Sequence, residues 1–149
     1  MKKTLPLDQQ LCFALYSASN AVVRLYRPLL HPFDLTYPQY VVLLALWQHD
    51  NVTLGELSAS TLFDSGTLTP LVKKLEQKEL LKRKPSTTDE RVKHVKLTER
   101  GQALETQVAG IMHALRCQIP QSDEHLIQLR QLAREIQQNI QKLERCSTR

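Results

Sequence analysis

Cys12 is the residue of the N-terminal segment whose side chain is best suited to redox chemistry. A cysteine attacks a peroxide as its thiolate, and a thiol with an ordinary pKa near ~8.5 is mostly protonated at neutral pH. The apolar spacing of residues 8–30 predicts a helix with Asp8 as its N-cap. At about 100° per residue, Tyr16 lies roughly 40° to one side of Cys12 and Tyr26 roughly 40° to the other. The thiol and the two phenols therefore share one face of the predicted helix.

The length of this helix limits which tyrosine can contact Cys12. Tyr26 lies about 21 Å further along a straight helix at ~1.5 Å per residue, so a contact must come from a dimer mate or another packing partner. No Lys, Arg or His lies within four residues of Cys12. Activation of the thiolate would therefore depend on hydroxyl donors and on the positive N-terminal end of the helix. The alternative is that Cys12 is a small buried apolar residue, as most cysteines on apolar helix faces are.

The remaining cysteines and histidines do not form a pattern typical of a metal or catalytic site. Three cysteines are an odd number, and Cys117 and Cys146 are too far from Cys12 in sequence to suggest a disulfide framework. The five histidines lack HxH or HxxxH pairing, so no zinc site is expected. A Gly-rich phosphate loop and a triad arrangement are also absent from the sequence. We expect no metal, no cofactor and no enzymatic activity.

Residues 53–98 have the pattern of a helix-turn-helix followed by a β-hairpin. Thr53 and Glu56 form a capping box that begins a short helix. The apolar side of this helix would be formed by Leu54, Leu57 and Leu62. A second helix begins near Asp64 or Ser65, either of which is a good N-cap. The exposed side of the second helix carries the residues that we expect to contact base edges and phosphates, namely Ser65, Thr67, Thr69, Lys73 and Lys74.

The hairpin that follows would be the wing of a winged helix. Segments 81–84 and 92–97 read as two strands around the polar turn 85–91, with the basic Lys84 on the first strand. The chain has 20 Lys and Arg against 15 Asp and Glu, a net charge of +5, and residues 73–100 contain ten basic and five acidic residues. A solvated charged face is the usual explanation of such a run. Here the charged run coincides with the wing and with the second helix of the helix-turn-helix, which we call the reading helix because it would contact the bases. This coincidence favours binding to double-stranded DNA.

Helices predicted outside the helix-turn-helix cover residues 8–30, 37–49, 98–118 and 122 onward. The expected N-caps of the last three are Thr36, Thr98 and Ser122. We therefore expect one domain over 1–149, mainly α with a small β-wing, in which 35–100 form the winged helix-turn-helix. The helices of 1–34 and 101–149 exceed what so small a core needs, which predicts a symmetric dimer packed through them. Such a dimer places two reading helices about 34 Å apart on one face of DNA.

The sequence predicts neither a membrane span nor a secretion signal. No uninterrupted apolar run approaches the ~18–20 residues that a span needs, and no h-region follows the basic start. We therefore expect a cytoplasmic protein, in which the cysteines are either inert core thiols or redox-active ones.

This order of elements is similar to the MarR family of winged-helix regulators. The wing segment resembles the family's Asp-x-Arg…Leu-Thr…Gly signature, which falls here on Asp89, Arg91, Leu97, Thr98 and Gly101. The resemblance implies that Arg91, at the wing tip, enters the minor groove of operator DNA and that Asp89 helps to hold the turn. It covers nearly the whole chain but does not indicate which signal is sensed.

Segments 11–19, 26–30, 35–40 and 62–71 resemble the OhrR branch of that family, which senses organic hydroperoxides. The resemblance implies that Cys12 is oxidised and that Tyr26 and Tyr37 hydrogen-bond its thiolate. Tyr16 is expected to support the thiolate as well, because it shares a face of the predicted helix with Cys12. Some members of the branch resolve the sulfenic acid with a second cysteine near the position of Cys117, as an intersubunit disulfide, whereas others use a small thiol. This chain resembles the two-cysteine kind, and Cys146 has no counterpart that we can assign.

Two other functions remain open at the level of sequence. A ligand-type regulator of the same family would bind a small phenolic molecule in an interhelical cleft, and Cys12 would then be structural. A thiol peroxidase would use Cys12 for turnover, but a catalyst does not need a charge excess confined to a reading helix and wing. We therefore expect a homodimeric repressor that organic hydroperoxides release from its operator.

Overall fold

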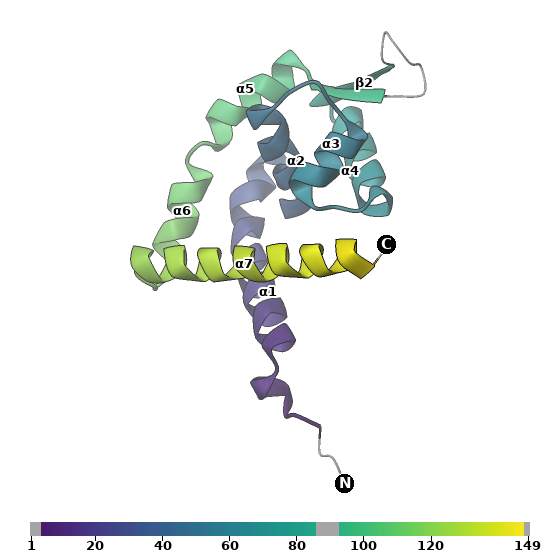
Figure 1. Ribbon diagram of the computed structural model, residues 1–149. Helices are drawn as coiled ribbons and strands as arrows, with labels where there is room; N and C mark the ends of the chain where they lie inside the picture. The colour runs from purple at the N-terminus through teal and green to yellow at the C-terminus, as the bar shows by residue number, and fades with distance from the viewer. Residues whose placement is uncertain (1–3, 86–92, 148–149) are drawn as a thin grey trace. The chain divides into compact units, whose positions relative to one another are not determined.

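The computed structural model describes residues 4–85 and 93–147, which form twelve helices and strands; Figure 1 labels the seven α-helices and β2. The helical segments are a 3-10 turn at Leu7–Gln9, α1 Leu11–Leu30, a 3-10 turn at His31–Phe33, α2 Tyr37–Gln48, α3 Leu54–Thr61, α4 Ser65–Gln77, α5 Glu99–Val108, α6 Ile111–Gln118 and α7 Asp123–Ser147. The strands are β1 Val52–Thr53, β2 Leu81–Pro85 and β3 Lys93–Leu97. The chain divides into a compact unit up to Arg116 and a second unit from Cys117 onward.

The first unit is a winged helix-turn-helix, in which α2, α3 and α4 gather beside the hairpin of β2 and β3 (Figure 1). The sheet has the order β1-β3-β2 and is antiparallel, with Leu81 opposite Leu97 and Val52 opposite Val95. The fully buried side chains come from α1, α2, α3, α4, β2 and β3: Leu30, Val42, Leu43, Leu46, Leu57, Leu68, Val72, Leu75, Leu81 and Val95. One apolar core therefore fixes the reading helix and the wing to the same body, and the predicted fold class is confirmed.

Side-chain caps begin most of the helices where the sequence predicts them. Thr36 and Thr53 each form a complete capping box, with Gln39 and Glu56 as the reciprocal partners. The predicted threonine cap of α5 is also present, since the hydroxyl of Thr98 accepts from the Gly101 amide at 3.0 Å. In the second unit, the hydroxyl of Ser122 accepts from the amide of His125 at 3.3 Å at the start of α7.

The start of the first helix differs from its prediction. Asp8 lies inside a separate 3-10 turn, and α1 begins at Leu11 after Gln10, whose extended backbone interrupts the helix. The side chain of Gln10 makes no cap and instead donates to the carbonyl of Leu5 at 3.0 Å. The apolar spacing continues through this break, so periodicity alone does not reveal it.

Two further boundaries were predicted incorrectly. The single helix expected over 98–118 is two helices, α5 and α6, separated at Ala109 and Gly110; a glycine costs a helix about 1 kcal/mol relative to alanine. Leu62 does not extend the apolar side of α3, because it ends that helix in the left-handed region with φ 61° and is 60% exposed. Strand β1 was not predicted, since two residues are too few to show an alternating pattern.

Gly101 is required by close packing between α5 and the sheet. A Cβ atom at this position would lie 1.9 Å from the carbonyl oxygen of Leu80 and 3.1 Å from Cδ2 of Leu97. We expect Gly101→Ala to lower the free energy of unfolding by about 3 kcal/mol, because backbone atoms must move to relieve the overlap. Gly110→Ala is the matched control, since its Cβ atom would meet nothing within 4 Å. Equal urea midpoints for the two variants would contradict this prediction.

Within the described residues, the helices are either too short or too polar to cross a membrane.

Candidate DNA-binding surface and sulfur site

Helix α4 has the buried and exposed sides expected of a reading helix. Leu68, Val72 and Leu75 are buried, and Leu71 is half-buried. The residues of α4 that were predicted to contact DNA are exposed: Ser65, Thr67, Thr69, Lys73 and Lys74. They occupy the first three turns of α4, so the exposed beginning of this helix offers hydroxyls and cations to a groove.

The beginning of α4 is held by Asp64. Its carboxylate accepts from the amide of Thr67 at 2.8 Å and from the hydroxyl of Thr67 at 2.9 Å. These hydrogen bonds lower the pKa of Asp64, so the cap is ionised at neutral pH. The Thr67 hydroxyl can therefore act towards DNA only as an acceptor while this bond is intact.

The first strand of the wing is attached to α4 by an ion pair that sequence reasoning missed. The Glu76 carboxylate accepts from the backbone amide of Arg83 at 3.0 Å and from Nε of Arg83 at 2.8 Å. Nη2 of Arg83 lies 2.6 Å from Oε2 of Glu76. These contacts lower the pKa of Glu76. Lys84 is exposed on the same strand. Asp89 and Arg91, the residues assigned to the wing tip, lie outside the described residues.

Cys12 and Tyr16 lie on an exposed stretch of α1. The Cys12 thiol is exposed, and Tyr16 is 66% exposed. Within one chain, Cys12 is therefore not a buried apolar residue. Tyr26 is on the same continuous helix but is 7% exposed. The phenol of Tyr26 cannot reach Cys12 of its own chain along this helix.

The structure brings Tyr26 and Tyr37 together. Their ring centroids are 4.6 Å apart with an interplanar angle of 41°, although the residues belong to α1 and α2. Tyr40 adds a third ring, and we call Tyr26, Tyr37 and Tyr40 the tyrosine cluster. The ring centroid of Tyr40 is 5.9 Å from that of Tyr26 and 6.2 Å from that of Trp47. Tyr40 and Trp47 were not predicted as site residues, although their spacing of seven residues places them on one side of α2.

Tyr26 is a neutral hydrogen-bond donor at physiological pH. Burial raises its pKa to about 12, with smaller contributions from Tyr37 and Tyr40. Burial also raises the pKa values of Tyr37 and Tyr40. The hydroxyl of Tyr26 donates to Sδ of Met112 at 3.3 Å. The tyrosine cluster therefore keeps its phenols protonated, and one of them already donates to a sulfur atom.

Comparison with known proteins assigns this arrangement to a family. A family model described as transcriptional regulator SarA/Rot matches residues 24–108. The chain is 42% identical over 124 residues to the organic hydroperoxide resistance transcriptional regulator of Bacillus subtilis. The aligned residues cover 83% of this chain and 84% of that regulator. The chain belongs to the MarR family of winged-helix regulators, in its OhrR branch.

Solved structures of related regulators have the same fold. Reduced AbfR bound to DNA is 32% identical, with a TM-score of 0.80, over 92% of this chain and 94% of that one. The AbfR protein is from Staphylococcus epidermidis. A disulfide form of AbfR matches with a TM-score of 0.68 at 32% identity, over 92% of this chain and 91% of that one. These matches are to transcriptional regulators rather than to enzymes.

The second and third cysteines of this MarR-family chain are also exposed. Cys117 lies at the end of α6, where the second compact unit begins, and Cys146 lies near the end of α7. The described residues contain no disulfide and no group of three His, Cys, Asp or Glu side chains placed to hold a metal ion.

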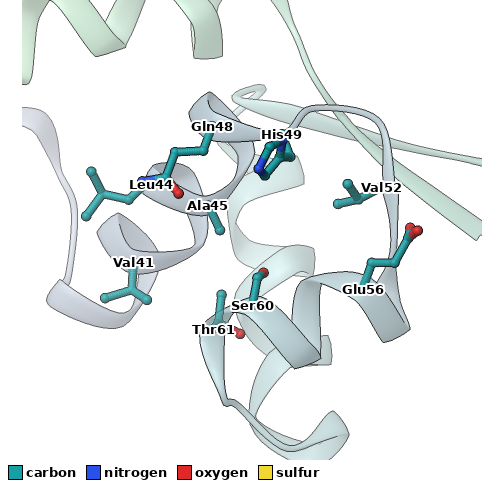
Figure 2. A pocket seen from close by; sticks show the side chains of 9 residues that line it. All are labelled: Val41, Leu44, Ala45, Gln48, His49, Val52, Glu56, Ser60 and Thr61. Atoms are coloured by element: carbon teal, nitrogen blue, oxygen red, sulfur yellow. The ribbon is translucent and has the colours of Figure 1, made fainter. Parts of the chain in front are cut away.

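A cavity of about 470 Å³ lies between α2 and α3 of this regulator (Figure 2). Ala45 of α2 points into it from one side, and Ser60 and Thr61 of α3 point into it from the other (Figure 2). Its full lining is Val41, Leu44, Ala45, Gln48, His49, Val52, Glu56, Ser60 and Thr61. The volume is within the range of small-molecule sites, and the cavity does not include the tyrosine cluster.

Proposed function

We propose that this protein is a redox-sensing transcriptional repressor that organic hydroperoxides release from a palindromic operator. The observation that carries the proposal is the ring pair of Tyr26 and Tyr37, whose phenols are protonated. It is supported by the exposed thiol of Cys12 and by the membership of the chain in the OhrR branch. Operator DNA in the cytoplasm would be its site of action.

The proposed active form is a homodimer. Residues 35–100 would read DNA, and residues 1–34 and 101–149 would form the dimer interface. Large apolar side chains that are exposed on α1 and α7 support this division: Leu11, Leu15, Ile127, Leu129, Ile140 and Leu143. The sulfur site would then form between subunits, since Cys12 and Tyr26 cannot meet on one helix.

The proposed chemistry is a two-electron oxidation of sulfur. The Cys12 thiolate attacks one peroxide oxygen, the O–O bond breaks, and the other oxygen leaves as an alkoxide that takes a proton to become an alcohol. A Cys117 thiolate from the other subunit then attacks the sulfenic sulfur, which forms a disulfide and releases hydroxide that leaves as water. The phenols of Tyr26, Tyr37 and Tyr16 would donate to the thiolate before the reaction, and a neutral sulfenic acid would accept those bonds less strongly.

The decisive experiment is an operator gel shift with and without cumene hydroperoxide. The probe is a palindromic duplex selected from a random-sequence library with the reduced protein. Wild type should bind this probe and be released by the hydroperoxide, whereas Cys12→Ser should bind and remain bound. Release of Cys12→Ser as readily as wild type would exclude the redox mechanism.

The reading surface has its own prediction, based on phosphate contacts. Lys73→Ala and Arg91→Ala should each weaken binding and lower the slope of log affinity against log salt by about one, because each loses a counterion-releasing contact. Lys142→Ala removes an exposed charge from α7 about 160° around the helix from Ile140 of the proposed dimer interface, and it should leave the slope unchanged. Salt-independent binding of wild type, or full affinity in the Lys73 and Arg91 double variant, would count against the winged-helix interpretation.

The second candidate function is release by a small ligand, and the cavity between α2 and α3 favours it. Its aliphatic wall and its hydroxyls from Ser60 and Thr61 suit a small phenolic molecule. This function would leave Cys12 without a redox role, so the gel shift above separates the two: ligand release would persist in Cys12→Ser.

A further inference from the structure

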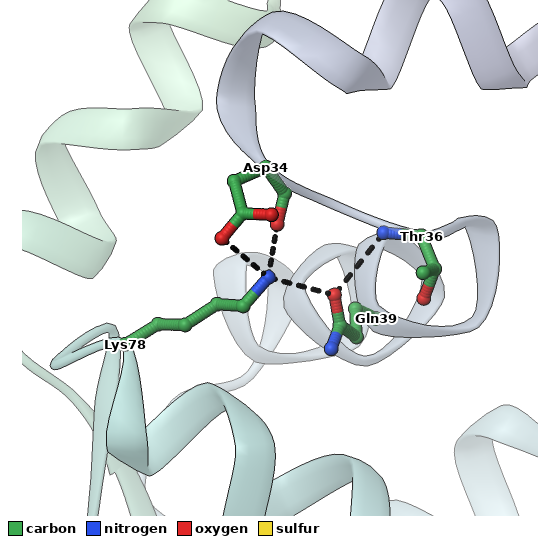
Figure 3. Close-up of polar contacts among 4 residues, drawn as sticks. All are labelled: Asp34, Thr36, Gln39 and Lys78. Carbon is green, nitrogen blue, oxygen red and sulfur yellow. Dashed lines mark hydrogen bonds and ion pairs between the residues drawn. The ribbon is translucent and has the colours of Figure 1, made fainter.

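Lys78 joins the end of the reading helix to the segment that carries Tyr37. It is the C-cap residue of α4, and its side chain is 25% exposed. Figure 3 shows its ammonium group reaching the loop between α1 and α2. The ammonium donates to the backbone carbonyl of Asp34, lies 3.0 Å from Oδ2 of Asp34, and lies 3.4 Å from Oε1 of Gln39.

The two residues that accept hydrogen bonds from the Lys78 ammonium, Asp34 and Gln39, lie on either side of Tyr37 in sequence. Asp34 ends the 3-10 turn after α1 in the left-handed region, with φ 52°. Gln39 is 3% exposed, and its Oε1 atom also accepts from the amide of Thr36 at 3.1 Å in the capping box of α2 (Figure 3). Tyr37 is the first residue of α2, between Thr36 and Gln39. The position of the Tyr37 backbone is therefore tied to the acceptors of Lys78.

The acceptors of Lys78 differ in burial, because Gln39 is buried and the Asp34 carboxylate is exposed. The Asp34 side chain is 90% exposed, and an ion pair to so exposed a carboxylate contributes little because water screens it. Gln39 is buried, and its single oxygen accepts from both the Thr36 amide and the Lys78 ammonium. Removing the ammonium leaves the capping box intact but releases the end of α4 from it.

We propose that Lys78 is a positioning residue that couples Tyr37 to the reading helix α4, so that a displacement of Tyr37 changes the affinity for DNA. This inference rests on the proposed function, in which oxidation of Cys12 removes a contact from Tyr37. The ring pair of Tyr26 and Tyr37 is at one end of the coupled path, and the C-terminus of α4 is at the other. The contacts between them are the two acceptors of Lys78.

The test is a double-mutant cycle on the affinity of the reduced protein for the selected palindromic duplex, without peroxide. Its variants are Tyr37→Ala, Lys78→Met and the double variant; methionine keeps an unbranched stem of similar length but has no charge. We expect a non-additive result of about fivefold or more, because Tyr37→Ala should have little effect once Lys78 no longer transmits it. Additive effects would overturn the proposal.

Controls separate positioning from loss of charge. Lys78→Arg should restore most of the affinity. Lys142→Met also removes one exposed lysine charge, but about 160° around α7 from Ile140 of the proposed dimer interface, and it should bind as wild type. The salt slope should be unchanged in Lys78→Met; a decrease of about one would show that Lys78 contacts phosphate and would overturn the proposal. If Lys78→Met does not fold, as judged by thermal unfolding, Lys78→Gln repeats the cycle.

The same variants separate this inference from the proposed function. If cumene hydroperoxide fails to release wild type, the redox function fails, while the cycle on reduced protein still tests the coupling. If wild type is released, Lys78→Met should lower the ratio of reduced to oxidised affinity by about fivefold or more. An unchanged ratio would show that oxidation reaches α4 by a route that does not include Lys78.

Discussion

A chain that ends after Gly110 is expected to bind the palindromic duplex about 10²- to 10⁴-fold more weakly than the full chain. This truncation removes α6 and α7 and with them most of the proposed dimer interface. A dimer engages its second half-site at a high effective concentration, and a monomer loses that gain without losing any single DNA contact. Sedimentation should show monomers or aggregate, and fluorescence anisotropy should give the affinity.

A single substitution tests the same interface without removing any of the chain. Ile140 is 50% exposed on α7, and Ile140→Glu would introduce a charge into the proposed interface. Gln138→Glu introduces the same charge about 160° around the helix, where the side chain is also exposed. We expect Ile140→Glu to be monomeric and Gln138→Glu to remain dimeric. A well-folded truncated monomer that binds the palindrome tightly would show that these helices are not the interface.

Much of the reading unit could be predicted because its signals are local. Capping boxes three residues apart locate the starts of α2 and α3, and the helical spacing of Leu68, Val72 and Leu75 identifies the buried side of α4. The change to an alternating pattern predicts β2 and β3. These features depend on neighbours within one or two turns, so a single sequence contains the information.

The elements that the sequence did not reveal depend on distant partners or on weak local preferences. Strand β1 exists because Val52 pairs with Val95, more than forty residues away. The tie from Lys78 to Gln39 and the pair of Glu76 and Arg83 are chosen by packing, and any exposed lysine or glutamate would look the same in sequence. The break at Gly110 is a modest preference that periodicity on both sides conceals.

The sulfur site is predictable in part for a geometric reason. The separation of Cys12 and Tyr26 along one helix already requires a second chain or another partner, and the structure keeps them on one continuous α1. The close approach of Tyr26 and Tyr37 joins two helices and emerges only from the fold. The donation from Tyr26 to Met112 likewise joins α1 to α6, which no local pattern indicates.

Oxidised wild-type protein is expected to run as a covalent dimer on a non-reducing gel, and this band should require both Cys12 and Cys117. The proposed disulfide pulls the beginning of α1 away from the phenols of Tyr26 and Tyr37, and the reading helices then lose their spacing of about 34 Å. Cys117→Ser should still form a sulfenic acid at Cys12, but its release from DNA should be incomplete or should reverse on addition of a thiol.

Cys146 provides the matched control, because it is also an exposed cysteine of the second unit. Cys146→Ser should form the dimer band and leave DNA as wild type does. Tyr37→Phe should still form the band but more slowly, since the thiolate loses a hydrogen-bond donor and less of it is present at neutral pH. A band that persists in Cys117→Ser and vanishes in Cys146→Ser would identify Cys146 as the resolving cysteine. A sulfenic acid in Cys117→Ser without any band in wild type would instead indicate that a small thiol resolves Cys12.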